Sequence, residues 1–168
     1  MIETERLILK PLTYEQLIKY IKADNSLEIE LNLNSTSRVI SPELKEAFEE
    51  TILPNVADKT KDYLYSTLWT LILKDANKMV GDICIFGEPN EKGEIEIGYG
   101  TYEEFENKGY MTEAVNGIIE WAKSQSNVLS IVASTEKENI GSYKILQKYN
   151  FIKIGEIDSL LGWKLELR

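Results

Sequence analysis

The segment from Glu94 to Ala133 constrains the fold more than any other part of the chain. The alternating residues Glu94–Tyr99 predict a strand, and apolar residues at helical spacing predict an amphipathic helix over Thr112–Lys123. A glycine-containing loop joins the two, and the run Val128–Ala133 predicts another strand after the helix. This order predicts a strand-loop-helix-strand unit.

The flanking sequence predicts strands and helices in an order typical of an α/β protein. Ser41, Pro42 and Glu43 place a cap, a first-turn proline and an acid before a helix that runs to about Ile52, and we expect Pro54 to end it. The stretch Asn25–Ser41 predicts no regular element. The other expected elements are a strand at Arg6–Leu12, a helix at Tyr14–Ile21, a hairpin of Leu68–Leu73 and Met79–Phe86, a helix at Asn139–Tyr149 and closing strands at Phe151–Ile157 and Trp163–Leu167. Residues 1–168 are therefore expected to form a single domain, an α/β sandwich around a mixed sheet.

Charge argues against a nucleic-acid partner. The chain has a formal net charge of −9 and contains no run of Lys and Arg, so the basic patch of a nucleic-acid binder is missing. The acidic balance suits either solubility alone or a cationic, amine-bearing substrate. No stretch approaches the roughly 18 consecutive apolar residues of a membrane span and no signal core is present, so we expect a cytoplasmic protein with no membrane partner.

The absence of histidine removes several classes of chemistry. Serine–histidine triads and zinc-hydrolase motifs are excluded because the chain contains no His and only one Cys, Cys84. We predict no metal site. A lone cysteine in an apolar run also excludes an internal disulfide and fits a reducing compartment.

The glycine loop within Tyr102–Ala114 is the most informative candidate site. Backbone amides at the start of a helix lack internal partners, and together with the helix dipole they form a site for a phosphate group. The alternative is that Gly109 only relieves a tight turn and Thr112 only caps the helix. No nucleotide P-loop sequence occurs, which disfavours a kinase.

This segment resembles the signature loop of the GCN5-related N-acetyltransferases (GNAT), particularly the Rim-type branch that acetylates the N-terminal amines of ribosomal proteins. Further motifs resemble that branch in the same order along the chain: Thr4-Glu5-Arg6-Leu7, Val80-Gly81, Glu96-Ile97-Gly98-Tyr99, Asn139-x-x-Ser142 and Lys148-Tyr149-Asn150-Phe151. Asn150 replaces the usual Gly and is compatible with a left-handed turn. The resemblance spans essentially the whole chain.

The resemblance implies a mostly antiparallel sheet, flanked by helices and splayed between the fourth and fifth strands of the family's numbering, with acetyl-CoA in the splay. The pyrophosphate of acetyl-CoA would lie on the backbone amides of Lys108, Gly109, Tyr110, Met111 and Thr112. An amide of Ile97, Gly98 or Tyr99 would hold the thioester carbonyl oxygen. Glu106 departs from the family's pattern, and we expect its carboxylate to face solvent.

The resemblance also assigns candidate catalytic roles. Glu96 is the favoured base, acting through a water, although it is equally compatible with a solvated strand residue, and Glu94 is the obvious substitute. Ser142 matches the serine of the Rim-type branch and is a candidate hydrogen-bond donor to the thiol sulfur. Leu146 stands where many relatives have a tyrosine that protonates the thiolate. Asn139 is expected to bind the pantetheine arm, unless it serves only as a helix cap.

The sequence thus predicts an N-acetyltransferase that moves an acetyl group from acetyl-CoA to a primary amine, on a small molecule or a protein N-terminus. The alternative is a catalytically silent acyl-CoA-binding sensor or interaction domain. A homodimer is compatible with the short terminal strands.

Overall fold

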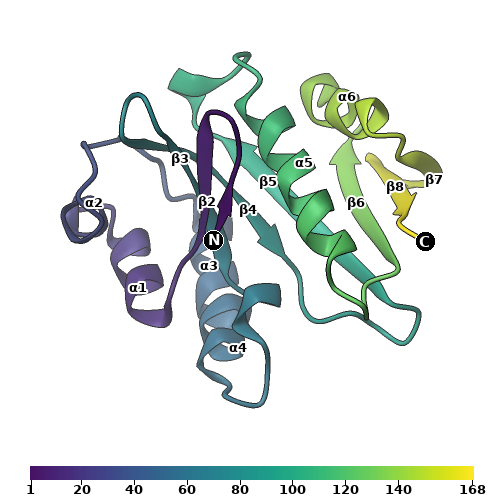
Figure 1. The fold of residues 1–168 in the computed structure, drawn as a ribbon, viewed down its shortest axis with the longest axis horizontal. Coiled ribbons are helices and arrows are strands. Elements are labelled where there is room, and N and C mark those ends of the chain that lie inside the picture. The colour runs from purple at the N-terminus through teal and green to yellow at the C-terminus, as the bar shows by residue number, and fades with distance from the viewer.

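An eight-stranded sheet forms the centre of the protein, and the computed structural model describes residues 1–168. The strands lie in the order β1-β2-β3-β4-β5-β6-β8-β7 (Figure 1). Their bounds are β1 Ile2–Glu3, β2 Leu7–Pro11, β3 Leu68–Leu73, β4 Lys78–Ile85, β5 Glu94–Thr101, β6 Ser130–Glu136, β7 Ile152–Ile157 and β8 Leu160–Glu166. Only β5 and β6 pair in parallel, whereas the other neighbours are antiparallel. The prediction of a mixed, mostly antiparallel sheet is confirmed.

Helices cover both faces of this sheet. They are α1 Tyr14–Lys22, α2 Ser26–Glu30, α3 Pro42–Ala47, α4 Leu53–Ala57, α5 Tyr110–Lys123 and α6 Ile140–Lys148, with a π-helical turn at Phe48–Ile52 and 3-10 turns at Tyr63–Tyr65 and Glu103–Phe105. None of these helices is both long enough and apolar enough to cross a membrane.

The two hydrophobic clusters of the core lie on opposite faces of the sheet. Alternate residues of β3 belong to different clusters: Trp69 joins the larger one and Leu68 the smaller one. The larger cluster includes the apolar residues of α5 and Leu146 of α6, and the smaller one includes Leu17 of α1. Helices α5 and α6 therefore pack on one face, and α1 packs on the other with the turn around Phe48.

Strands β5 and β6 part halfway along their length. They are paired from Glu94 opposite Ser130 to Ile97 opposite Ala133. Beyond that point β5 continues to Thr101 paired only with β4, and β6 continues to Glu136 paired only with β8. This gap is the predicted splay, because these are the fourth and fifth strands of the family's numbering.

The helix that begins at Pro42 does not end at Pro54, so that prediction is wrong. A π-helical turn at Phe48–Ile52 leads directly into α4, and Pro54 lies in the first turn of α4. The proline ring clashes with the carbonyl of the preceding turn in a regular α-helix, and the wider π-helical turn before Pro54 relieves that clash.

The stretch Asn25–Ser41 contains α2, which its composition did not predict. Glu28 of α2 pairs with Arg38 at 2.9 Å, and their side chains are only 3% and 2% exposed. The Arg38 guanidinium also lies 4.5 Å from the centre of the Tyr20 ring and donates to the Tyr20 carbonyl oxygen. The Glu28–Arg38 ion pair and the contacts of Arg38 with Tyr20 of α1 thus order this stretch.

Candidate functional site

The loop before α5 presents unpaired backbone amides. Gly109 adopts a left-handed φ of 81° and is the N-cap of α5, without a capping side chain. The amides of Tyr110, Met111 and Thr112 lie in the first turn and have no carbonyl of the helix to bind. Thr112 is inside the helix and does not cap it, so that part of the alternative interpretation is wrong.

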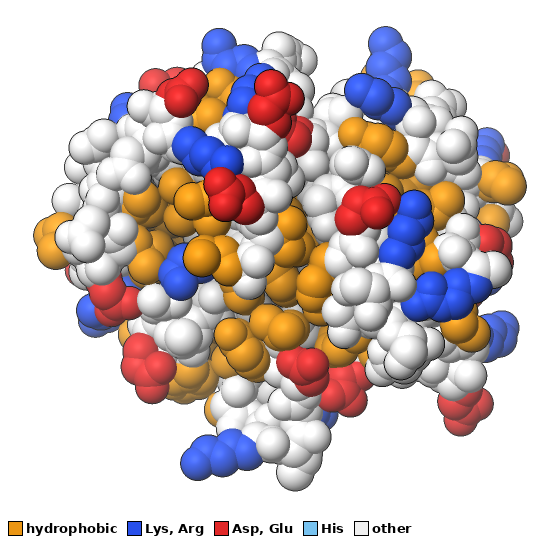
Figure 2. Space-filling model, viewed as in Figure 1, with side chains coloured by type: hydrophobic (Ala, Val, Ile, Leu, Met, Phe, Trp, Pro, Cys, Tyr) orange, Lys and Arg blue, Asp and Glu red, His pale blue; other side chains and the backbone are white.

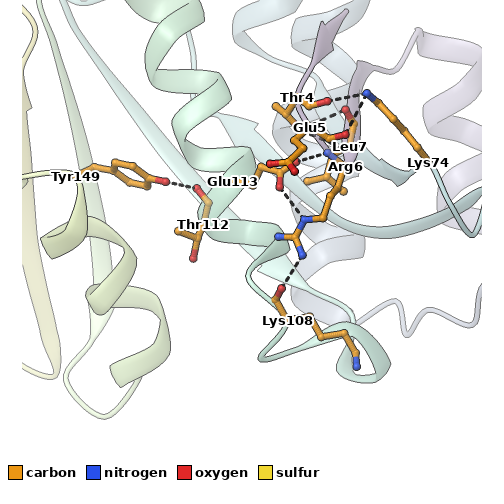
Figure 3. Close-up of polar contacts among 9 residues, drawn as sticks. All are labelled: Thr4, Glu5, Arg6, Leu7, Lys74, Lys108, Thr112, Glu113 and Tyr149. Atoms are coloured by element: carbon orange, nitrogen blue, oxygen red, sulfur yellow. Dashed lines mark hydrogen bonds and ion pairs between the residues drawn. The ribbon is translucent and has the colours of Figure 1, made fainter.

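An ion pair between the chain's start and α5 holds this loop in place (Figure 3). Arg6 Nε donates to Glu113 Oε1 at 2.8 Å, and Arg6 Nη1 donates to the Lys108 carbonyl oxygen at 3.1 Å. The guanidinium lies 4.6 Å from the centre of the Tyr110 ring. Both sides of Gly109 are therefore fastened to the same arginine.

The contacts of Arg6 with Glu113 and with the Lys108 carbonyl form what we call the Arg6–Glu113 anchor, and the Glu113 carboxylate lies at its centre. Its Oε2 accepts hydrogen bonds from the Thr4 hydroxyl and from the Arg6 amide, the latter at 2.8 Å. Partial burial acts to raise the pKa of Glu113, but the hydrogen bonds from Thr4 and Arg6 outweigh it and lower the pKa. The anion is thus the stable form at neutral pH.

A cavity of about 590 Å³ opens between this loop and the start of α6. In Figure 2 the surface is hollowed at its upper edge, over the region where the top of α5 lies beside α6 in Figure 1. The cavity is lined by Tyr99–Thr101, Phe105–Thr112, Glu138–Ser142 and Ile145. It therefore collects all five residues predicted for the pyrophosphate, together with Tyr99, Asn139 and Ser142. Glu106 also borders it and is exposed.

A second cavity, of about 350 Å³, meets the first in the gap between β5 and β6. Tyr99, Asn139 and Ser142 border both cavities, and the Tyr99 hydroxyl donates to the Ser142 carbonyl oxygen at 2.9 Å across the gap. The remaining lining residues are Phe86, Glu96, Ile97, Gly98, Ser134, Thr135, Glu136 and Leu160. The residues predicted from the family's fourth strand, which is β5 here, and from the last helix, α6, thus line the same cavity.

The two candidate bases, Glu96 and Glu94, have different surroundings. Glu94 forms an ion pair with Lys164 at 2.7 Å and accepts from Asn90 at 3.1 Å, and the Lys164 ammonium lowers the pKa of Glu94. Glu96 is exposed, has no ion-pair partner and lines the second cavity. The carboxylate of Glu94 is therefore paired with Lys164 of β8, whereas the carboxylate of Glu96 has no ion-pair partner.

The residues of α6 have distinct surroundings. Asn139 caps the helix, since its Oδ1 accepts from the Ser142 amide at 3.2 Å. Leu146 is fully buried in the core, so the position of the family's tyrosine faces away from solvent here. Tyr149 donates to the Thr112 carbonyl oxygen at 3.0 Å and ties the end of α6 to the first turn of α5 (Figure 3).

Two features of the site could not be predicted from the sequence. The Arg6–Glu113 anchor joins residues 107 positions apart, so no local pattern could reveal it. Phe86 lies over Gly98: a Cβ added to Gly98 would be 2.8 Å from Phe86 Cζ. The only available signal was an aromatic residue at the end of a strand, which does not distinguish a site from a core.

Comparison with known proteins places this architecture in a family. The family model described as "Acetyltransferase (GNAT) domain" matches residues 6–152. The uncharacterized N-acetyltransferase YjdG of Bacillus subtilis (strain 168) is 34% identical over 155 residues, which cover 90% of this chain and 89% of that protein.

Solved structures share the fold at lower identity. An acetyltransferase (GNAT family) from Bacillus anthracis superposes with a TM-score of 0.67 at 19% identity, covering 99% of this chain and 98% of that one. The ribosomal-protein-S5-alanine acetyltransferase from Vibrio fischeri gives a TM-score of 0.68 at 18% identity, covering 98% and 94%. Rim-type enzymes are thus among the structural neighbours. The matched domain and the YjdG relationship show that this chain belongs to the GNAT acetyltransferase family.

Proposed function

We propose that the chain is an acetyl-CoA-dependent N-acetyltransferase, acting as one domain over residues 1–168 on a primary amine of a small molecule or a peptide N-terminus. The observation that carries this proposal is the meeting of two cavities at Tyr99, Asn139 and Ser142. Transfer between two substrates requires their reacting atoms to meet in a fixed orientation, and a shared gap between two cavities provides such a meeting point.

The first cavity fits the pyrophosphate of the donor. Free amides at the start of α5 offer hydrogen bonds, and the positive end of the helix dipole favours an anion there. Peptide amides carry no net charge, so a protein of net charge −9 can still bind a polyanion locally. The Arg6 guanidinium is neutralised by Glu113, so it supports the donor site by holding the Lys108 carbonyl and the loop in place.

Strand geometry favours Tyr99 as the amide that holds the thioester carbonyl oxygen. The Phe86 amide donates to the Glu96 carbonyl at 2.9 Å, so Glu96, and by alternation Gly98, direct their hydrogen-bonding groups toward β4. Ile97 and Tyr99 then direct theirs toward β6. Ile97 still has a partner there, whereas Tyr99 lies beyond the last pair, and its amide is directed into the gap.

Glu96 is the proposed base. An amine must lose its proton before it attacks, and Glu96 is an unpaired carboxylate on the second cavity. In the transfer a bond forms between the amine nitrogen and the acetyl carbon, the carbon–sulfur bond breaks, and the proton released by nitrogen balances the one taken up by sulfur. Ser142 borders both cavities, and its hydroxyl is the proposed donor to that sulfur.

The test measures release of free thiol from acetyl-CoA in the presence of primary amines. The Glu96→Gln variant is expected to slow release by about 10²-fold or more while acetyl-CoA binding stays intact. Glu50→Gln, an exposed glutamate of the π-helical turn, is the charge-matched control. Binding without any thiol release from the wild-type chain would favour a silent acyl-CoA sensor. An unchanged rate in Glu96→Gln would remove Glu96 as the base.

A further inference from the structure

The walls of the second cavity are partly apolar. The Phe86 ring lies against Gly98 and remains 56% exposed, so one aromatic surface is open beside the gap. Leu160, at the start of β8, borders the same cavity and is 41% exposed. Such exposed apolar side chains at a cavity suit the hydrocarbon part of a ligand.

Two carboxylates of the second cavity have no cationic partner. Glu96 and Glu136 both line it, and neither forms an ion pair or a side-chain hydrogen bond. Glutamates close by are neutralised: Glu94 pairs with Lys164 at 2.7 Å, and Glu156 pairs with Lys137 at 3.2 Å. The basic residues of this region are therefore engaged elsewhere, and the cavity keeps its negative charge.

The two free carboxylates lie on neighbouring strands, Glu96 on β5 and Glu136 on β6, at different positions along the strand direction. Glu96 is opposite Val132 in the paired part of the sheet. Glu136 lies further along β6, past the point where β5 and β6 part, at about 13 Å from Val132 by the rise of a strand. Both side chains are exposed and can lean toward each other, so one flexible chain with a positive charge at each end can reach both.

We infer that the acceptor is an aliphatic diamine or polyamine, whose reacting nitrogen lies at Glu96 and whose second ammonium group lies at Glu136. The hydrocarbon between them contacts Phe86 and Leu160. This inference rests on the proposed function, and it assigns Glu136, Phe86 and Leu160 to acceptor recognition. A monoamine uses the carboxylate at Glu96 only, and a peptide N-terminus lacks the unbranched apolar stem that the two walls accommodate.

The test compares three acceptors: cadaverine, pentylamine and an uncharged-side-chain tripeptide with a free α-amine. Cadaverine and pentylamine have the same carbon chain, so they differ by one positive charge. We expect kcat/KM for cadaverine to exceed that for pentylamine by about two- to fivefold, as one additional solvent-screened ion pair provides. Glu136→Gln is expected to abolish this preference by raising KM for cadaverine, and Glu50→Gln is expected to leave the preference unaltered.

Direct titration of cadaverine separates the two proposals. If no amine yields thiol, the proposed transferase activity fails, whereas cadaverine binding that is weakened by Glu136→Gln still supports the acceptor site. Equal kcat/KM for cadaverine and pentylamine, preference for the tripeptide, or cadaverine binding indifferent to Glu136→Gln would each overturn the inference.

Discussion

The hydroxyl group of Tyr99 donates a hydrogen bond of 2.9 Å to the carbonyl oxygen of Ser142, and this contact joins β5 to α6. Both residues border the two cavities that meet there. Tyr99 is more than half buried, and this burial raises the pKa of its hydroxyl, so the hydroxyl remains a donor at neutral pH. This hydrogen bond thus ties the strand that carries the proposed oxyanion amide to α6.

Removal of this hydroxyl is expected to lower the stability of the folded protein. Tyr99→Phe keeps the ring in place and leaves the Ser142 carbonyl without its partner, which costs about 1 kcal/mol of unfolding free energy. Urea unfolding measures this loss. Tyr63→Phe, at a half-exposed tyrosine outside both cavities, is the control. Equal stability of Tyr99→Phe and the wild-type chain would show that this hydrogen bond does not stabilise the folded protein.

The Arg6 anchor is expected to control donor affinity. Arg6→Lys keeps the positive charge but cannot bind Glu113 and the Lys108 carbonyl together, because an ammonium group lacks the planar fork of donors. Calorimetric titration should show acetyl-CoA affinity reduced by about tenfold. Arg168→Lys alters a similar set of bonds from a guanidinium to carbonyl oxygens, away from the loop, and should leave affinity unchanged. Wild-type affinity in Arg6→Lys would refute a role of the anchor.

Asp82 is expected to make stability fall as pH rises from about 4 to 6. Burial raises the pKa of Asp82 from 3.8 to about 6, even though Tyr20 and Tyr102 donate to its Oδ2. The folded chain therefore holds this proton over a range where the unfolded chain has lost it, and the free energy of unfolding decreases through that range.

Asp82→Asn isolates this effect. Its amide oxygen can accept from the same tyrosines, and its NH₂ group can donate to Thr70 Oγ1, which is buried without a partner next to Asp82 on the paired strand. The stability of Asp82→Asn minus that of the wild-type chain should grow by about 1–3 kcal/mol between pH 4 and pH 6 and then level off. A difference independent of pH would contradict a raised pKa.

Local patterns predicted most of the fold, because each signal was confined to a few residues. The hairpin of β3 and β4, the start of α3 at Ser41-Pro42 and the strong helix α5 follow from alternation, capping and helical spacing. Asn150 adopts a φ of 66°, in agreement with the left-handed turn expected from its residue type. Pro54 was misassigned because a π-helical turn leaves no signature in composition.

The site was predictable only where the family's motifs mark it. The glycine loop, Glu96 and Ser142 belong to quoted motifs, and the structure brings them to neighbouring cavities. The Arg6–Glu113 anchor and the Asp82 cluster depend on register and packing between distant segments, which a single sequence does not reveal. The distinction between Glu94 and Glu96 likewise required the position of Lys164 on β8.

Thermal unfolding with and without acetyl-CoA tests the central claim most directly. A ligand that binds only the folded chain stabilises it by about 2.7 kcal/mol at a hundredfold excess over Kd, so we expect a Tm increase of several degrees. Gly109→Val, which strains a φ of 81° and places a Cβ 3.3 Å from Arg6 Nη2, should lose the increase. Gly87→Val, at a φ of 110° with open space around it, should keep the increase. No increase at millimolar acetyl-CoA, or an undiminished one in Gly109→Val, would show that the loop before α5 does not bind acetyl-CoA.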